Sequence, residues 1–141
     1  MFFRKSKPVQ EPLTEEEKLL NEYGKHKGQN TADEYFSALS LVEYYYKLRE
    51  DAQSLEKCIK YCNVCIYLLD TPQMQACIFP PEEDAKGIRI PAFRHLITIN
   101  EKKKNYLAAY NLCLNAIKYS PNRAEELEYY TNKAEKLKAK L

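Results

Sequence analysis

The residues of this sequence whose types and spacing suit chemistry are three cysteines. Cys58, Cys62 and Cys65 lie four and three positions apart. Thiolates at such spacing can bind three irons of a four-iron cluster, so one hypothesis is an iron–sulfur protein. Reduced, buried cysteines also behave as small apolar side chains. The competing hypothesis is therefore that this spacing serves helix packing.

The sequence around the three cysteines favours packing. Their spacing is similar to that of the cluster-binding cysteines of radical S-adenosylmethionine enzymes, but it lies inside a strong helical pattern and not in a loop after a strand. The chain shows no alternation of strand and helix patterns and is too short for the barrel of those enzymes. Moreover, Ala109, Cys113 and Ala116 repeat the spacing 51 residues later, and alanines bind no iron.

A zinc site is a further alternative, in which other cysteines and histidines would converge with these thiols. The candidates are Cys77, Cys113, His26 and His95. However, the sequence has no second Cys-x-x-Cys pair, no Ser/His/acid or Cys/His pairing, and too few glycines for a phosphate loop. We interpret His95 as a surface or groove residue and not as a general base. We expect no enzymatic activity, no cofactor and no metal.

Length and composition indicate one small globular domain. The 141 residues are 45% apolar and 30% charged, and the net charge is only +2, with signs that alternate along the chain. A surface with so little net charge has no strong positive potential that would attract nucleic acid. No apolar run reaches the roughly 18 residues that cross a bilayer. Five cysteines without an export signal fit reduced thiols, so we expect a cytoplasmic protein without stable membrane association.

Helix signals begin at Thr14, after a polar segment at residues 1–13 that we expect to be a disordered tail. Thr14 with Glu17 and Thr31 with Glu34 are capping-box patterns, and Ser54 is a further N-cap candidate. The first predicted helix follows Thr14 for about three turns and ends near residues 24–28. The others cover about 32–49, 55–69, 91–103, 106–119 and 121–140, and residues 73–79 could add one turn. The sequence therefore predicts a single all-α domain over residues 14–141, with a long excursion at 73–90.

Two helical hairpins repeat within this domain, at about residues 32–72 and 90–121. Each has large apolar residues in its first helix and small residues at spacing four and three in its second, which lets the two backbones approach closely. The matched residues are Val42 with Phe93, Tyr45 with Leu96, Leu55 with Tyr106, Cys58 with Ala109, Cys62 with Cys113, Cys65 with Ala116 and Ile66 with Ile117.

In this pattern the chain resembles the tetratricopeptide repeat family. The second hairpin carries most of the resemblance, through Phe93, Leu96, Tyr106, Ala109, Ala116 and the closing Pro121. Tyr46 and Ile97 depart from it, because they stand where the family usually has small residues. The resemblance implies antiparallel hairpins stacked as a short right-handed superhelix of five to six helices, with a capping helix at 121–140. It also implies a concave groove that binds peptide segments.

Carried over by position, the groove would present residues from the first helix of each hairpin. These are Ser40, Glu43, Lys47, Glu50, Arg94, Thr98, Glu101 and Lys102. The first four also belong to a narrow polar stripe, together with Ser37, that helical periodicity predicts independently. The mixed charges argue against a basic clamp for carboxylates. We expect a non-enzymatic module that binds a peptide or helix of another protein. The alternatives are a structural homodimer or spacer and, more remotely, an iron–sulfur or zinc protein.

Overall fold

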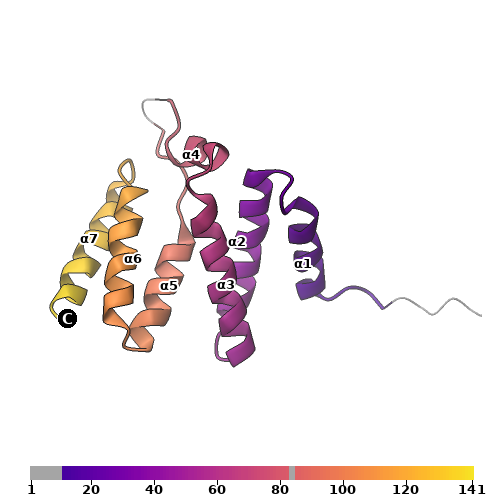
Figure 1. Cartoon of the computed structure of the whole chain (residues 1–141), viewed down its shortest axis with the longest axis horizontal. Helices are drawn as coiled ribbons and strands as arrows, with labels where there is room; N and C mark the ends of the chain where they lie inside the picture. Colours follow the sequence, from indigo (N-terminus) through magenta and orange to yellow (C-terminus); the bar gives the residue numbers. More distant parts are fainter. Residues whose placement is uncertain (1–10, 83–84) are drawn as a thin grey trace, which may run out of the picture.

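The computed structural model describes residues 11–82 and 85–141, and within these ranges it is all-α, with seven helices and no strand (Figure 1). The helices are α1 (Glu15–His26), α2 (Thr31–Lys47), α3 (Ala52–Leu68), α4 (Pro72–Ile78), α5 (Pro91–Lys102), α6 (Tyr106–Lys118) and α7 (Ala124–Lys138). The all-α prediction is confirmed. The seventh helix is α4, which the sequence indicated only as one extra turn. The predicted tail falls mostly on residues 1–10, outside the described residues.

The first hairpin, α2 with α3, forms the centre of the core. Cys58, Cys62 and Cys65 are all fully buried against α2, where Tyr35 and Val42 are equally buried. The Sγ atoms of Cys58 and Cys65 lie 3.8 and 3.9 Å from the backbone oxygens of Val42 and Tyr35. The three cysteines therefore lie on the face of α3 that packs on α2, as their spacing predicts.

Two of the predicted N-cap residues differ from those in the structure. Asn30, not Thr31, caps α2, because its side-chain oxygen accepts from the backbone N–H of Asp33. Asp51, not Ser54, caps α3. Carboxylate and amide side chains compete well with hydroxyls for this position. The capping box of α1, Thr14 with Glu17, is confirmed.

The second hairpin, α5 with α6, repeats the first. Pro91 stands in the first turn of α5, and Ala109, Cys113 and Ala116 of α6 are fully buried. The last helix begins at Ala124 and not at residue 121, because the Ser120 hydroxyl donates to the carbonyl of Ala116 at 2.8 Å and so closes α6 instead of capping α7. Within α7, Tyr130, Ala134 and Leu137 are buried.

The excursion between α4 and α5 is held to the helices on both sides. The backbone N–H of Ile88 donates to the carbonyl of Cys77, and Arg123 donates twice to the carbonyl of Gly87, at 2.8 and 3.2 Å. Gly87 has φ +75°, and a Cβ at this position would lie 2.1 Å from the carbonyl oxygen of Ile78. Only glycine fits there. The end of the excursion is therefore fixed in place next to the start of α7.

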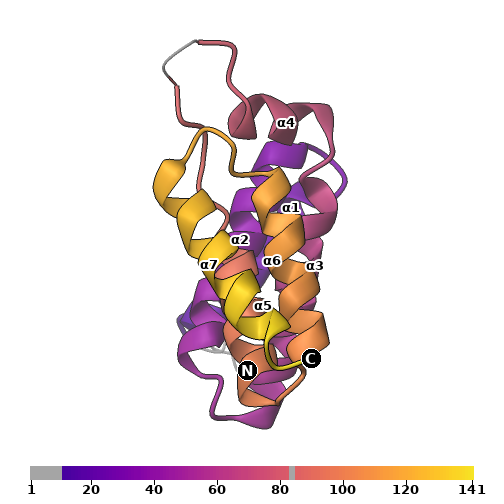
Figure 2. The same ribbon diagram turned by 90° about the vertical axis from the view of Figure 1, so that its left-hand side faces the viewer.

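The helices form a row in which α3 and α6 share one face, as Figures 1 and 2 agree. On the other face, α2, α5 and α7 are joined by polar side chains. In the part of the chain that the structure describes, no helix is long and apolar enough to cross a membrane.

Candidate functional site

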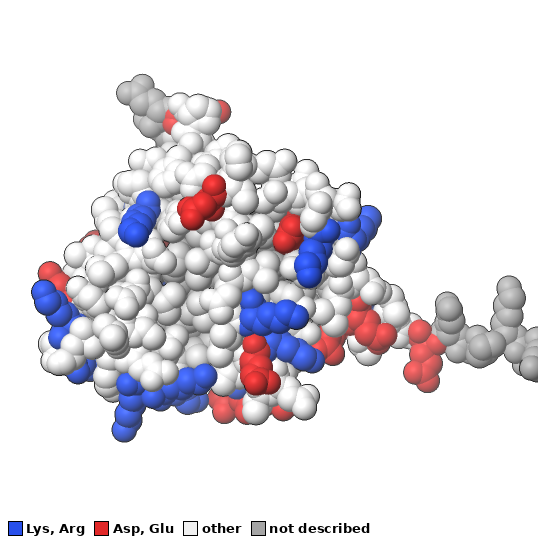
Figure 3. All heavy atoms as spheres, viewed as in Figure 1, with Lys and Arg blue, Asp and Glu red and all other residues white. Residues whose placement is uncertain are grey.

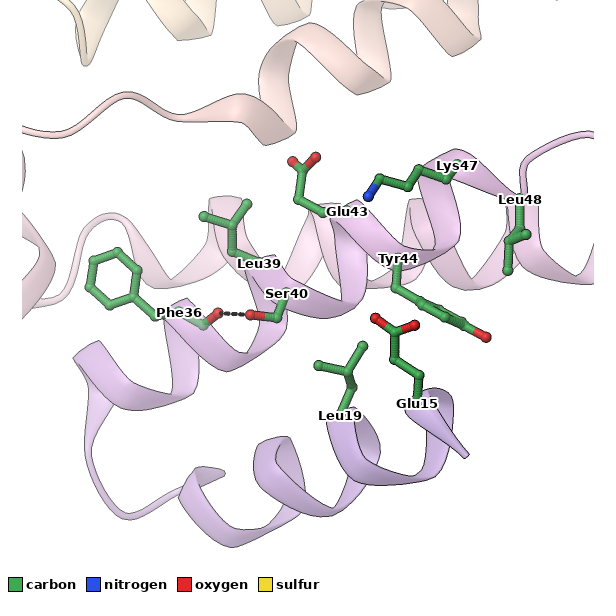
Figure 4. A pocket seen from close by; sticks show the side chains of 9 residues that line it. All are labelled: Glu15, Leu19, Phe36, Leu39, Ser40, Glu43, Tyr44, Lys47 and Leu48. Carbon is green, nitrogen blue, oxygen red and sulfur yellow. Dashed lines mark hydrogen bonds between the residues drawn. The ribbon is translucent and has the colours of Figure 1, made fainter. Parts of the chain in front are cut away.

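A hollow of about 730 Å³ lies between α1 and α2 (Figure 4). Its lining is mainly apolar but includes three charged side chains. The nine lining residues are Glu15, Leu19, Phe36, Leu39, Ser40, Glu43, Tyr44, Lys47 and Leu48. Phe36 is 43% exposed and Leu48 is 44% exposed, although both are large apolar side chains that line this hollow. In Figure 4, Leu19 and Glu15 rise from α1 towards Tyr44 on α2. The hollow is open, apolar and flanked by carboxylates.

Helix α1 is held beside α2 by contacts at both of its ends. Near its start, the Tyr45 hydroxyl donates to the Glu16 carboxylate at 2.7 Å, and this hydrogen bond lowers the pKa of Glu16. Near its end, Tyr23 packs edge-to-face on Tyr61 of α3, with ring centroids 5.4 Å apart. A helix held at two points leaves a fixed gap along α2, so the hollow is preformed.

A second hollow of about 360 Å³ lies on the other side of Glu43. It is lined by Glu43, Arg89, Ile90, Pro91, Arg94, His95 and Glu126. Glu43 belongs to both linings, so the two hollows meet at its side chain and form one groove from α1 to α7. Glu43 Oε1 lies 2.8 Å from His95 Nε2, and the His95 ring packs on Tyr46 with centroids 3.8 Å apart.

The end of this groove near α7 is closed by a buried carboxylate. Glu126 is only 6% exposed and lies 3.0 Å from the guanidinium of Arg94 and 3.1 Å from that of Arg89. The Arg94 guanidinium also stacks over the Tyr129 ring at 3.8 Å. Two cations therefore pair with one buried anion at this end of the groove.

The structure brings together some of the predicted groove residues but not all eight. Ser40, Glu43 and Lys47 line the first hollow, and Glu43 and Arg94 line the second. Glu50 and Lys102 face each other at 3.8 Å, both strongly exposed, and Glu101 pairs with Lys133 of α7 at 3.1 Å. Thr98 is exposed and lines neither hollow.

One residue of the predicted polar stripe is misplaced. Ser37 is buried, at 8% exposure, and its hydroxyl donates to the carbonyl of Glu34. A serine can satisfy its hydroxyl on the preceding helical turn, so its polarity does not require an exposed position.

The sequence did not identify several residues of the groove. Glu15 and Leu19 were missed because the expected groove was built from the first helix of each hairpin, whereas α1 precedes the first hairpin. Arg89 and Glu126 were missed because their roles depend on how the excursion and α7 are placed. The sequence does hold one signal for an apolar binding surface here. Phe36 and Leu48 are large apolar residues close to the two ends of the predicted polar stripe.

The cysteines form no comparable site. Burial raises the pKa of the Cys65 thiol to about 12 and that of Cys113 to about 11, so both thiols are protonated at neutral pH. Among residues 11–82 and 85–141, no group of three or more His, Cys, Asp and Glu side chains is arranged to hold a metal ion.

Comparisons of this chain with protein-family models, with curated proteins and with solved structures found no match.

Proposed function

We propose that the protein is a non-enzymatic interaction module that binds a segment of another protein in the groove, chiefly in its hollow between α1 and α2. The observation that carries the proposal is the partly exposed pair Phe36 and Leu48, which face one concavity of about 730 Å³. Exposed apolar side chains gathered in a concavity are typical of surfaces that bind other proteins.

The charges around the groove suggest which chemistry the segment should have. Arg94 already pairs with Glu126, and Lys102 faces Glu50. Glu15 and Glu43 flank the apolar lining, with Lys47 as the cation of this hollow. A partner helix with two or three apolar side chains on one face and a basic residue beside them fits this surface.

We also propose that the two hairpins stack as in tetratricopeptide repeats. The repeated positions of the small residues in α3 and α6 agree with such stacking, and the groove would then lie on its concave side. The five free cysteines favour a cytoplasmic location.

The polar groups around the groove make hydrogen bonds within the protein. The Ser40 hydroxyl donates to the carbonyl of Phe36 at 3.1 Å, so it is not directed at the His95–Glu43 pair.

A peptide-display selection tests the proposal. Peptides would be selected on the full chain, and the affinity of a purified peptide would be compared for wild type, Ser40→Trp and Thr131→Trp. Ser40 lines the hollow and is exposed, whereas Thr131 is an exposed residue of α7 that lines neither hollow. We expect Ser40→Trp to weaken binding at least about tenfold, since the indole fills the hollow, and Thr131→Trp to leave it unchanged. Equal affinities for both variants would show that the groove is not the binding site.

The competing role is a structural homodimer or spacer formed through the same groove. In that case the wild type would dimerise in sedimentation experiments, and Ser40→Trp would dissociate the dimer without any peptide present.

A further inference from the structure

A third hollow, of about 560 Å³, adjoins the α7 end of the groove. Arg89, Arg94 and Glu126 line both this hollow and the second one, so the groove continues past Glu126. The remaining lining residues come from the excursion and from the start of α7, and they are Lys86, Asn122, Arg123, Ala124 and Glu125. The third hollow therefore collects side chains from the excursion, from α5 and from α7.

Cations outnumber carboxylates in the lining of the third hollow. The four cations are Lys86, Arg89, Arg94 and Arg123, and the two carboxylates are Glu125 and Glu126. This excess of two positive charges equals the net charge of the whole chain. On the face of α3 and α6, by contrast, Figure 3 shows Lys and Arg side chains beside Asp and Glu side chains in several places. The third hollow is thus a local concentration of positive charge.

The arginines of this hollow keep charge and donors for a ligand. Arg89 and Arg94 share the single carboxylate of Glu126, at 3.1 and 3.0 Å, so two positive charges meet one negative charge. Arg123 contacts the neutral carbonyl of Gly87, and this contact uses two of its five N–H donors. The Arg89 side chain is 58% exposed. An anion that enters the hollow can therefore reach guanidinium groups whose charge the fold does not balance.

We propose that the third hollow binds a phosphate group on a serine or threonine of the partner segment, an inference that rests on the proposed function. A phosphorylated side chain carries a charge of about −1.5 to −2 at pH 7, which matches the excess of positive charge, whereas a carboxylate has a single negative charge. Guanidinium groups donate paired N–H groups to phosphate oxygens. Because neighbouring hollows share lining residues, one segment can reach from the first hollow to the third.

The charges along the groove also set the direction of the segment. The hollow between α1 and α2 holds two carboxylates, Glu15 and Glu43, beside one cation, Lys47, whereas the third hollow holds an excess of cations. The basic residue of the segment should lie at the first of these ends and its phosphate at the second, because each then meets charge of the opposite sign.

Inorganic phosphate tests the third hollow without any partner. The full chain would be titrated with phosphate at constant pH and ionic strength, while NMR follows the backbone amide shifts. We expect shift changes mainly in residues 85–89 and 122–126, with a Kd on the order of 1–10 mM. Phosphate that leaves the amides of these two segments unchanged would overturn the proposal.

Two double variants separate a defined site from general attraction of anions. Lys86→Glu with Arg89→Gln changes the third hollow. The control, Lys60→Glu with Lys118→Gln, changes the net charge equally on α3 and α6, at positions that line none of the three hollows. All four positions are exposed, so both variants should fold, which thermal unfolding checks. We expect the first variant to weaken phosphate binding at least about tenfold and the control to leave it unchanged. Equal weakening by the two would overturn the proposal.

A phosphorylated peptide tests whether the site belongs to the groove. A peptide selected on the chain would be synthesised with serine or with phosphoserine at the end opposite its basic residue. We expect phosphoserine to tighten binding to the wild type at least about tenfold, and to have little effect on binding to Lys86→Glu with Arg89→Gln. Equal affinities of the wild type for the two peptides would overturn the proposal. The groove itself would still stand in that case if Ser40→Trp weakens the binding of both peptides.

Discussion

The ε2 nitrogen of His95 lies 2.8 Å from the Oε1 atom of Glu43, and this contact joins α5 to α2 at the point where the two hollows of the groove meet. The His95 side chain is 19% exposed, and its ring rests on that of Tyr46. The imidazole therefore positions the carboxylate that we expect a partner's basic residue to approach.

Replacement of His95 by alanine should destabilise the protein by about 1–2 kcal/mol, because it removes a part-buried hydrogen bond and an aromatic contact. Urea unfolding measures this loss. The matched control is His26→Ala, which also removes a contact of 2.8 Å, from His26 to Glu22, but lies away from the groove. Peptide binding should weaken for His95→Ala and not for His26→Ala. Equal peptide binding by the two variants would show that the contact from His95 does not position Glu43 for binding.

The sequence predicted the helices well and the groove only in part. Periodicity placed Cys58 and Cys113 on buried faces, because both sit within long helices whose phase is set by many neighbours. It could not place α1 beside α2, since that packing depends on Tyr45 reaching Glu16 across 29 positions of the chain. Similarly, nothing local in the sequence relates Glu126 to Arg94, which lies 32 residues earlier. Contacts of this kind follow from the tertiary structure alone.

Replacement of Gly87 by alanine should destabilise the protein by at least about 2 kcal/mol. The new Cβ would meet the Ile78 carbonyl oxygen, and the positive φ adds backbone strain. The control is Gly24→Ala in α1, where nothing lies within 4 Å of the new Cβ and φ is not positive. This control should stabilise the protein by about 0.5–1 kcal/mol. Similar melting temperatures for the two variants would show that the excursion is not anchored at Gly87.

Replacement of Cys62 by aspartate should prevent stable folding, because it buries an unpaired carboxylate at a position with no exposed surface. Glu56→Ala, at an exposed position of the same helix, should change stability by less than about 0.5 kcal/mol. Thermal unfolding followed by circular dichroism compares the two. Comparable unfolding temperatures would show that the phase of α3 is wrong.

Native thiol reactivity tests the burial of the cysteines independently. Cys77 is half-buried, whereas Cys58, Cys62, Cys65 and Cys113 are fully buried. A thiol reagent at pH 8 should label one cysteine, Cys77, before unfolding and all five after it, since burial keeps the reagent away from the other four thiols. Rapid labelling of Cys65 in the native protein would contradict this packing.

Loss of the Tyr45 hydroxyl should destabilise the protein in a pH-dependent manner. The pKa of Glu16 is lowered from its ordinary value of 4.5, first by the hydrogen bond from Tyr45. The ionised carboxylate therefore stabilises the fold above pH 4.5, and this contribution disappears as pH falls through the lowered pKa. Tyr45→Phe should cost about 1 kcal/mol at pH 7, and the difference from wild type should shrink towards about pH 2. A difference that stays constant with pH in urea unfolding would rule out this linkage.

Amide hydrogen exchange of the full chain with and without a selected peptide tests the groove most directly. We expect the peptide to slow exchange in α1 and α2, because binding in the hollow restrains the contact between these two helices. Exchange in α3 and α6 should stay unchanged, because no residue of these helices lines the hollow. Slower exchange confined to α3 and α6, with α1 and α2 unaffected, would contradict the central claim that the partner binds in the hollow between α1 and α2.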